Sequence, residues 1–394
     1  MQAGHNYRPD IDGLRALAVL PVVFYHAGFE SFSGGYVGVD VFFVISGYLI
    51  TSIIAREIES DTFSLSHFYE RRARRLFPAL FTVLAATAVG SFFLLMPWEL
   101  EDFGQSLATT AIFSSNFLFF TEAGYFDGPA EMKPLLHTWS LAIEEQYYLL
   151  FPAFLFAVRN FLGGRYIGAT AGLFIASFVI SVWSTYAAPD AAFYLLPSRT
   201  WELMLGSLIA LGTPMISKAG LRQFTALLGV ALVLTAVFLF QHDTRFPGLA
   251  ALVPCIGTAL IIIAGMGSQS TAVGKLLSWK PIVAVGLISY SLYLWHWPVL
   301  VLAKHYLLRP LDGLEASVLV GFSLLLAYVS WRFVEKPFRG KDALLDRRGV
   351  FRWSGGAILG LIVIGLVFDE TEGLSGRLPA DVAQIAAVAD DKPP

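Results

Sequence analysis

An arginine and a histidine frame the first apolar stretch of the sequence. Arg15 stands at the start of this stretch and His26 lies eleven residues later, within it. On an α-helix that spacing is about three turns, or ~16 Å, and puts both side chains on one face. An arginine can bind the phosphates of a donor, and a histidine can take a proton from an attacking hydroxyl. A simpler interpretation also fits, with an arginine at the membrane interface and a histidine bonded to a neighbouring backbone.

A second group of polar side chains opens a later apolar stretch. His137, Ser140 and Glu144 recur at i, i+3 and i+7, which places them on one face of a helix. Glu145 adds a second carboxylate directly after Glu144. Ionisable groups are expensive in hydrocarbon, so this group is a candidate functional site. The structural alternative is an ion pair between these carboxylates and Arg199 or another helix.

Two more segments combine basic side chains with aromatic rings. Four arginines follow Phe68 and Tyr69, a cluster that suits nucleotide phosphates and anionic lipid equally well. In the segment 290–298, His296 stands between Trp295 and Trp297. These rings predict either the wall of a tunnel or a belt at the membrane interface, with His296 either a site residue or a structural histidine. The four arginines are Arg71, Arg72, Arg74 and Arg75.

Several familiar kinds of site are missing from the sequence. It contains no phosphate-binding G-x-x-x-x-G-K-[ST] loop, no H-E-x-x-H helix and no G-x-S-x-G elbow. A single cysteine, Cys255, excludes an internal disulfide and a cysteine-rich zinc site, so we expect no metal. Basic residues are dispersed between apolar stretches, which gives no support to nucleic-acid binding.

Composition places the chain in a membrane. Of its 394 residues, 56% are hydrophobic and only 14% charged, with a mean hydropathy of +0.64. Soluble domains carry about 25% charged residues. The apolar stretches do not alternate with polar residues as barrel strands do, so the sequence predicts helices. Eleven stretches approach the ~20 residues that cross a bilayer core. They are 14–32, 36–55, 76–96, 138–158, 166–187, 198–213, 222–241, 248–266, 282–303, 315–334 and 353–368.

A twelfth apolar stretch, about 104–121, decides which side each loop faces. It is interrupted by glutamine, serine, threonine and asparagine, which favours a re-entrant or interfacial segment. With that choice, the segments rich in arginine and lysine all fall on one side, which the positive-inside rule assigns to the cytoplasm. We therefore predict an all-α polytopic membrane protein with about eleven transmembrane helices and one re-entrant segment. Its N-terminus is cytoplasmic and its C-terminus lies outside.

Seven short motifs, in this order, give the chain a resemblance to the membrane acyltransferase-3 family of sugar O-acetyltransferases. The resemblance covers about residues 7–339. It includes a basic residue separated by ten intervening positions from a histidine, a pattern met by Arg15 and His26. Each motif is weak alone, and the ordered set is highly specific. The motifs are RPDIDGLR (8–15), GVDVFFVISGYLI (38–50), RRARRLFP (71–78), HTWSLAIEEQYYLLFP (137–152), RTWEL (199–203), YSLYLWHWP (290–298) and FVEKPFR (333–339).

The resemblance implies a reaction and a set of site residues. Acetyl-CoA binds from the cytoplasm, and the acetyl group passes to a cell-surface polysaccharide such as O-antigen, or to a free or lipid-linked glycan. His26 is a base or a transient acyl carrier, with Asp12 or Glu335 orienting groups at the inner mouth. The donor phosphates are expected at Arg8, Arg15, Arg71, Arg72, Arg74 and Arg75. Other candidate site residues are His137, Ser140, Glu144, Glu145, Arg199, Glu202 and His296.

The end of the chain departs from the fused subgroup of this family, whose members continue into a periplasmic SGNH hydrolase-like domain. The sequence contains no Gly-Asp-Ser nucleophile segment and no Asp-x-x-His pair. We expect an acyltransferase-like domain over 1–340, a cytoplasmic basic loop over 341–352, an added span over 353–368 and a periplasmic linker over 369–394. An SGNH-type domain or protein is the expected partner. This chain alone should then consume acetyl-CoA slowly and leave the final polysaccharide unmodified.

A different class of function would use the same buried charges. A transporter that flips acyl groups or lipid-linked sugars without bond chemistry needs charged residues along its pathway. Such a transporter predicts inverted repeats with broken helices at matching positions, and the sequence shows none. An acyltransferase in the cytoplasmic (inner) membrane of a bacterium is therefore the favoured prediction.

Overall fold

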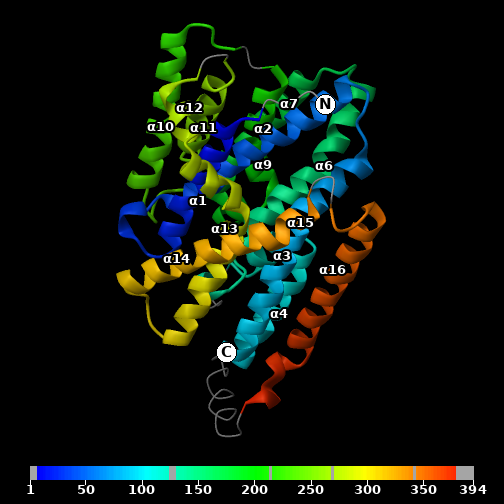
Figure 1. Ribbon diagram of the computed structural model, residues 1–394, viewed down its shortest axis with the longest axis vertical. Helices are drawn as coiled ribbons and strands as arrows, with labels where there is room; N and C mark the ends of the chain where they lie inside the picture. Colours follow the sequence, from blue (N-terminus) through cyan, green and yellow to red (C-terminus); the bar gives the residue numbers. More distant parts are fainter. Residues whose placement is uncertain (1–6, 124–129, 213–214, 268–269, 340–342, 379–394) are drawn as a thin grey trace. The chain divides into compact units, whose positions relative to one another are not determined.

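The computed structural model describes residues 7–123, 130–212, 215–267, 270–339 and 343–378. These residues form helices and no strands, which confirms the predicted all-α polytopic membrane class. The helices belong to two compact units, whose elements can be followed in Figure 1. The first unit comprises Met1–Leu65 and Ile143–Tyr293, and the second comprises Ser66–Ala142 and Leu294–Pro394. The predicted domain over 1–340 therefore contributes to both.

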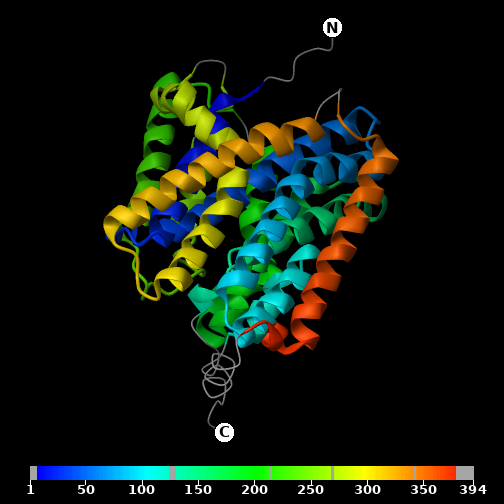
Figure 2. The ribbon, with the colours of Figure 1, turned by 60° about the horizontal axis from the view of Figure 1, so that its bottom comes forward.

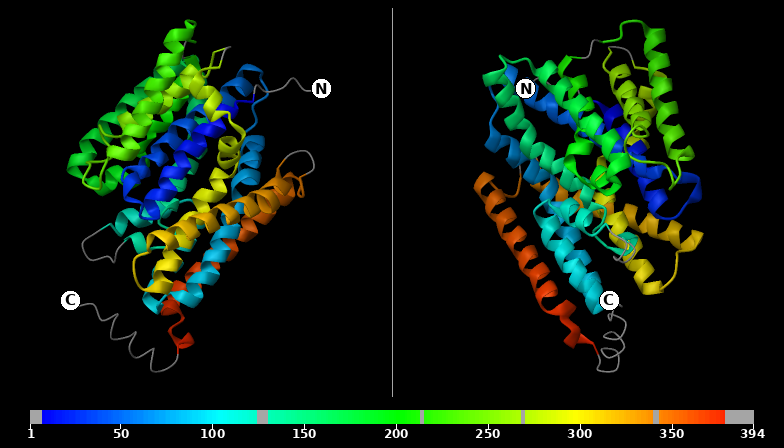
Figure 3. Two further views of the ribbon diagram at one scale, coloured as in Figure 1. Left: turned by 60° about the vertical axis from the view of Figure 1, so that its left-hand side comes forward. Right: turned by 180° about the vertical axis from the view of Figure 1, so that it is seen from behind.

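Helices of the first unit approach closely at glycines. A Cβ atom at Gly47 of α2 would lie 1.8 Å from the carbonyl oxygen of Leu203 in α9, so only glycine permits this backbone contact. Helices α10 and α11 also lie side by side (Figure 3). The unit contains α1 (Pro9–His26), η1 (Glu30–Phe32), η2 (Gly35–Val37), α2 (Gly38–Glu59), α7 (Tyr166–Ala187), α8 (Pro189–Tyr194), α9 (Leu196–Gly212), α10 (Ala219–Leu239), α11 (Leu252–Ala264), α12 (Ala272–Leu277) and parts of α6 (Thr138–Phe161) and α13 (Lys280–Leu307).

In the second unit, α4 and α16 also approach each other closely at glycines. A Cβ atom at Gly104 or Gly365 would lie 2.5 Å from the carbonyl oxygen of the other residue, and Figure 2 shows the two helices side by side. The last helix is thus packed into this unit. The unit contains α3 (Leu65–Leu94), α4 (Pro97–Ala111), α5 (Ser115–Thr121), η3 (Ala130–Met132), α14 (Gly313–Ser330), η4 (Trp331–Glu335), α15 (Lys336–Phe338), α16 (Arg347–Glu370), η5 (Glu372–Arg377) and the remaining parts of α6 and α13.

Eight helices of the described chain are long and apolar enough to cross a membrane, and each coincides with a predicted span. The other three predicted spans coincide with α1, α9 and α11. Helices α9 and α11 have only 17 and 13 residues. Helix α1 has 18 residues, and Asp10, Asp12 and Arg15 lie within it. Its charged first turns are helical, so the helix begins at Pro9 and ends at His26, where the prediction gave 14–32.

The stretch predicted not to span is broken into α4 and α5. Helix α4 has 15 residues, about 22 Å of helix, which is short of a ~30 Å hydrocarbon core. The break falls at Phe113, whose φ is 55°. Beyond α5 the chain returns toward the start of α4, because His305 Nε2 donates to the carbonyl oxygen of Met132 at 3.0 Å and its Nδ1 lies 3.6 Å from Glu99. This geometry fits a re-entrant segment.

Cysteine labelling should place both ends of the α4–α5 segment on one side of the membrane. Single cysteines at Met96, Ala130 and Leu162 are suitable, because these side chains are exposed and the native Cys255 is buried. We expect an impermeant maleimide added to intact cells to label Met96→Cys and Ala130→Cys but not Leu162→Cys. Labelling of Met96→Cys and Ala130→Cys from opposite sides would show that the segment crosses.

Two predicted loops are partly helical, which corrects the sequence analysis. The four arginines at 71–75 lie in the first turns of α3, not in a loop before it. The basic loop predicted over 341–352 ends early, because α16 begins at Arg347, where the Asp346 side chain accepts a hydrogen bond from the Gly349 backbone N–H at 2.8 Å. Residues 341 and 342 of that loop lie outside the described residues.

The predicted linker over 369–394 also begins as ordered structure. Helix α16 continues to Glu370, and η5 follows directly. Arg377 donates to the carbonyl oxygens of Phe92 and Leu95, which tie η5 to the turn between α3 and α4. The tail therefore packs against the second unit as far as the description extends, to residue 378.

Basic side chains of the first unit gather at one end of its helices. That end contains the start of α1, the end of α2, the α6–α7 connection and the start of α10, which meet around shared contacts. Among the described residues of this unit, the only arginine or lysine side chains at the opposite end are the exposed Arg245 and the buried Arg199. The basic residues at the first end are Arg8, Arg15, Arg56, Arg159, Arg165, Lys218, Arg222, Lys275 and Lys280.

Candidate functional site

The start of α1 forms a small polar cluster around Asp12. Tyr7 donates through its hydroxyl to Asp12 Oδ2 at 2.8 Å, and Arg15 Nη1 donates to Asp12 Oδ1 at 3.3 Å. Partial burial, this hydrogen bond and the charge of Asp12 raise the pKa of Tyr7 to about 12, so its hydroxyl stays a donor at neutral pH. Close packing fixes the cluster, since a Cβ atom at Gly286 would lie 1.8 Å from the Asp12 carbonyl oxygen. Asp12 therefore holds the Arg15 guanidinium at the start of α1, and its predicted role in the reaction stays a prediction.

Arg8 is held in place by protein groups. Its guanidinium pairs with Asp10 at 2.5 and 3.1 Å and donates to the hydroxyl of Tyr48 and the carbonyl oxygen of Ile262, each at 3.3 Å. These contacts tie the start of α1 to α2 and α11. Arg8 therefore serves at least the packing of this end, and Arg15 is the stronger candidate for a donor phosphate in this unit.

His26 is the last residue of α1, about three turns from Arg15. The ring of Tyr25 lies 5.2 Å from that of His26 and 5.5 Å from that of His242, between centroids. The Tyr25 hydroxyl also lies 3.2 Å from His242 Nδ1, a hydrogen bond. His26 is half-buried, so a titratable imidazole stands where α1 meets the following loop. His242 and Tyr25 were not predicted, because nothing in the local sequence pairs residues so far apart.

A fully buried charge cluster joins α2 and α9. Arg199 donates through Nη2 to Asp40 Oδ1 at 3.0 Å, and its Nη1 lies 3.0 Å from Glu202 Oε1. Asp40, Glu202 and Cys255 bring their ligand atoms within 4.8 Å of one another. The guanidinium already supplies the positive charge there, and a cation would be repelled by it. We therefore assign Arg199 and Glu202 to a structural ion-pair cluster centred on Asp40, which the sequence analysis named only within a motif.

Glu144 is anchored by hydroxyl groups. Ser46 of α2 donates to Glu144 Oε1 at 2.5 Å, and the Tyr148 hydroxyl donates to the same oxygen. Glu145 is the neighbouring half-buried carboxylate on α6. Arg199 forms its ion pairs with Asp40 and Glu202. The alternative predicted from the sequence, an ion pair between Glu144 and Arg199, is not one of them. The motif over 38–50 therefore holds α2 to α6 and α9.

Two predicted clusters meet within the second unit. The ring of His137, just before α6, lies 5.7 Å from that of His296 on α13, and both are buried. Trp297 is also buried and donates through Nε1 to the Lys133 carbonyl oxygen at 2.8 Å, so an exposed aromatic belt does not describe this pair. Ser140 donates to the His137 carbonyl oxygen at 3.3 Å. His137 and Ser140 therefore share a unit with His296, whereas Glu144 belongs to the first unit.

Arginines of the second unit surround Glu70 and Glu335. Arg74 donates twice to Glu70 Oε1, at 2.9 and 3.0 Å, and Arg347 donates to Glu70 Oε2 at 2.7 Å. Buried Glu335, at the end of the π-helical η4, pairs with Arg339. These contacts bring the 71–78 and 333–339 motifs and the start of α16 to one end of this unit.

Arg75 differs from Arg74 in its surroundings. The Arg75 carbonyl accepts a hydrogen bond from Arg339 at 3.2 Å, while its guanidinium makes no hydrogen bond or ion pair with the described residues. Arg71 and Arg72 lie half-buried one turn earlier. Arg75 is therefore the candidate in this unit for an external phosphate, and Arg74 is committed to Glu70.

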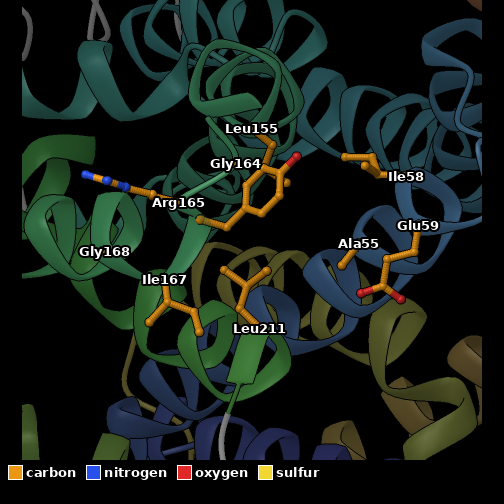
Figure 4. A pocket seen from close by; sticks show the side chains of 10 residues that line it. Ala55, Ile58, Glu59, Leu155, Gly164, Arg165, Ile167, Gly168 and Leu211 are labelled. Carbon is orange, nitrogen blue, oxygen red and sulfur yellow. The ribbon is translucent and has the colours of Figure 1, made fainter. Parts of the chain in front are cut away.

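A pocket of the first unit that is lined mostly by apolar residues contains none of the predicted site residues. It has a volume of about 260 Å³ and lies at the basic end, between the ends of α2 and α9 and the α6–α7 connection. Figure 4 shows Ala55, Ile167 and Leu211 facing it, with the Arg165 side chain directed away. We assign no chemistry to this pocket.

Comparison with known proteins decides the family. The model of the acyltransferase domain family matches residues 8–332. The chain belongs to this acyltransferase family. Family membership favours acyl transfer over the transporter alternative, and the match contains every predicted site residue except Glu335.

Among the relatives of this family member are two O-acetyltransferases. Peptidoglycan O-acetyltransferase OatA of Listeria monocytogenes is 33% identical over 85% of this chain, which covers 56% of that protein. O-acetyltransferase OatA of Staphylococcus aureus is 32% identical over 95% of this chain, which covers 64% of that protein. The chain thus spans about three fifths of the length of these relatives. No solved structure matches it.

Proposed function

We propose that this chain takes an acetyl group from acetyl-CoA at the basic end of its helices and passes it to a glycan hydroxyl at the other end. One observation carries the proposal: in an acyltransferase family member, Arg15 and His26 lie toward opposite ends of the 18-residue helix α1. That helix is about 27 Å long, and the eleven residues from Arg15 to His26 span about 16 Å of it, roughly half of the ~30 Å thickness of a bilayer core.

The proposed orientation follows the charge distribution. The basic end of the first unit faces the cytoplasm by the positive-inside rule, which puts Arg15 on the donor side and His26 on the outer side of a bacterial cytoplasmic membrane. CoA carries its thioester at the end of a long flexible arm. Phosphates held by Arg15 therefore allow the thioester to extend along α1 toward His26.

His26 supports transfer of the acetyl group in one of two ways. As a base, it takes the proton of the acceptor hydroxyl while that oxygen attacks the thioester carbonyl. The C–S bond breaks, and the CoA thiolate recovers the proton as CoA–SH. As an acyl carrier, its ring nitrogen attacks the thioester carbonyl, the C–S bond breaks, and CoA leaves as CoA–SH with the imidazole proton. The acceptor hydroxyl then attacks the acetylimidazole, the C–N bond breaks, and the hydroxyl proton returns to the imidazole. Rapid acid quenching and peptide mass spectrometry distinguish them, because only the second route leaves an acetyl group on His26.

The acceptor we propose is a glycan of the cell wall. The name of the Listeria relative specifies peptidoglycan, and no relative named above points to O-antigen. The experiment that tests the reaction is CoA release from acetyl-CoA by the detergent-purified chain, with acetylated product scored by mass after adding soluble peptidoglycan fragments. Acetyl-CoA turnover that produces no acetylated hydroxyl on any fragment would contradict acyl transfer to glycan by this chain.

Arg15→Ala should raise the KM for acetyl-CoA by about 10- to 100-fold, since a hydrogen bond to a charged group contributes about 1.5–3 kcal/mol. Arg56→Ala is the matched control, an exposed arginine at the same end of the first unit. Initial rates of CoA release over a range of acetyl-CoA concentrations measure the effect. An unchanged KM in Arg15→Ala, or an equal rise in Arg56→Ala, would remove Arg15 from the donor site.

A longer chain should differ in the acceptor that it acetylates and not in its reaction with acetyl-CoA. We expect this chain to release CoA slowly and to leave polymeric peptidoglycan unmodified, because it covers only 56% and 64% of the length of these two relatives. A version extended to the length of these relatives should acetylate the polymer. Equal polymer acetylation by both would show that the membrane part is sufficient.

A further inference from the structure

A polar pocket lies at the His26 end of the first unit. It has a volume of about 370 Å³ and is lined by Glu30, Ser33, Gln241, His242 and Asp243. This volume falls within the range of about 300–1,000 Å³ found for small-molecule sites. None of the five lining residues is apolar, whereas the pocket at the opposite end of α2 and α9 is lined mostly by apolar residues.

The pocket is connected to His26 through one tyrosine. Tyr25 neighbours His26 in the chain and contacts its ring, and its hydroxyl holds His242 Nδ1 at 3.2 Å. The Tyr25 ring also lies 5.5 Å from that of Tyr36, between centroids, which fixes it from the other side. Tyr25 therefore separates the pocket residue His242 from His26, the histidine to which the proposed function assigns acyl transfer.

The polar atoms of the pocket are available to a ligand. The side chains of Glu30, Gln241 and Asp243 make no hydrogen bond or ion pair with the described residues. Ser33 is committed, because its hydroxyl donates to the Phe240 carbonyl oxygen at 2.6 Å. Two carboxylates and one amide offer several acceptors and two donors, a set that matches the hydroxyl and acetamido groups of a sugar.

Charge narrows the class of sugar. Glu30 and Asp243 make the pocket negative, and its five lining residues include no lysine or arginine. An anionic sugar would be repelled by these two carboxylates, whereas a neutral sugar would not. From this geometry we infer that the pocket is the acceptor subsite of the chain and binds a neutral sugar unit, with Tyr25 and His242 positioning it toward His26. This inference rests on the proposed function for the role of His26.

Binding measured without acetyl-CoA tests the subsite separately from catalysis. The probe is chitotetraose, a neutral N-acetylglucosamine tetramer, titrated into the detergent-purified chain by isothermal titration calorimetry. The double variant Glu30→Gln with Asp243→Asn should weaken binding about tenfold, since each net hydrogen bond contributes roughly 1 kcal/mol. Asp190→Asn, an exposed acid at the start of α8 outside the pocket, is the matched control and should bind normally.

A second probe tests the charge argument. Tetragalacturonate, an anionic tetrasaccharide, should bind the unmodified chain more weakly than chitotetraose, and the double variant should narrow that difference. Glu30, Asp243 and Asp190 are all exposed, so we expect these substitutions to leave the fold intact. Thermal unfolding of each variant checks this. No chitotetraose binding by the unmodified chain, equal binding by the double variant, or preference for the anionic probe would each overturn the subsite. Chitotetraose binding with no CoA release from acetyl-CoA would instead overturn the proposed function and leave the subsite standing.

Discussion

Replacing His26 by alanine is expected to lower acetyl transfer by about 10²–10⁴-fold, the usual contribution of a general acid–base group. The variant removes the one titratable side chain that ends α1, while the half-buried position leaves helix packing largely intact. The measurement is the rate of acetylated saccharide formation by purified protein at saturating acetyl-CoA. Expression, membrane insertion and thermal unfolding should stay near those of the unmodified chain.

His26→Gln is the informative companion to His26→Ala. Glutamine keeps a hydrogen-bonding side chain but cannot accept the proton or carry the acyl group, so it should be as inactive as alanine. Transfer at the unmodified rate by His26→Ala would remove His26 from the reaction. Recovery by glutamine alone would assign His26 a positioning role.

Replacing Arg199 by alanine should lower the free energy of unfolding by about 3–5 kcal/mol, the cost of breaking a buried ion pair. Asp40 and Glu202 are fully buried, and the substitution leaves both carboxyl groups without the guanidinium between them. Three aromatic rings, those of Phe43, Phe193 and Phe246, would also lose their cation. Equilibrium unfolding in mixed detergent micelles measures the change.

Two further variants separate the charge effect from lost volume. Arg199→Leu combined with Asp40→Asn and Glu202→Gln removes the ions together and should recover much of the stability, because no uncompensated charge stays buried. Arg245→Ala, at an exposed arginine that lies over Tyr186, should change stability by no more than about 0.5 kcal/mol. A loss in Arg199→Ala no larger than that in Arg245→Ala would show that the buried cluster is not a stabilising element.

Helix positions could be predicted from the sequence because hydrophobicity along the chain directly reports burial in a bilayer. Helix starts were less predictable. The arginines at 71–75 belong to α3 because Glu70 neutralises Arg74 and Arg347, and Asp346 caps α16 several residues before its apolar part. Such pairs lie outside any hydropathy window, so α3 and α16 begin earlier than their apolar segments.

The candidate site was only partly predictable, for a related reason. Arg15 and His26 lie on one helix, so their spacing alone placed them on one face. The partners of Arg199, of His137 and of Tyr25 come from distant helices, and a single sequence does not report such contacts. Asp40 is the best example. In the sequence it is a lone aspartate in an apolar motif, and only the structure shows that it pairs with Arg199 on another helix.

Directional transfer in sealed vesicles is the most direct test of the central claim, that the acetyl group crosses from one end of the helices to the other. Inverted membrane vesicles containing this chain would enclose chitotetraose and receive radiolabelled acetyl-CoA outside. We predict that labelled acetyl-chitotetraose accumulates inside the vesicles, and that His26→Ala vesicles show none. Label found only on chitotetraose added outside, or equal luminal label in the His26→Ala vesicles, would contradict the account.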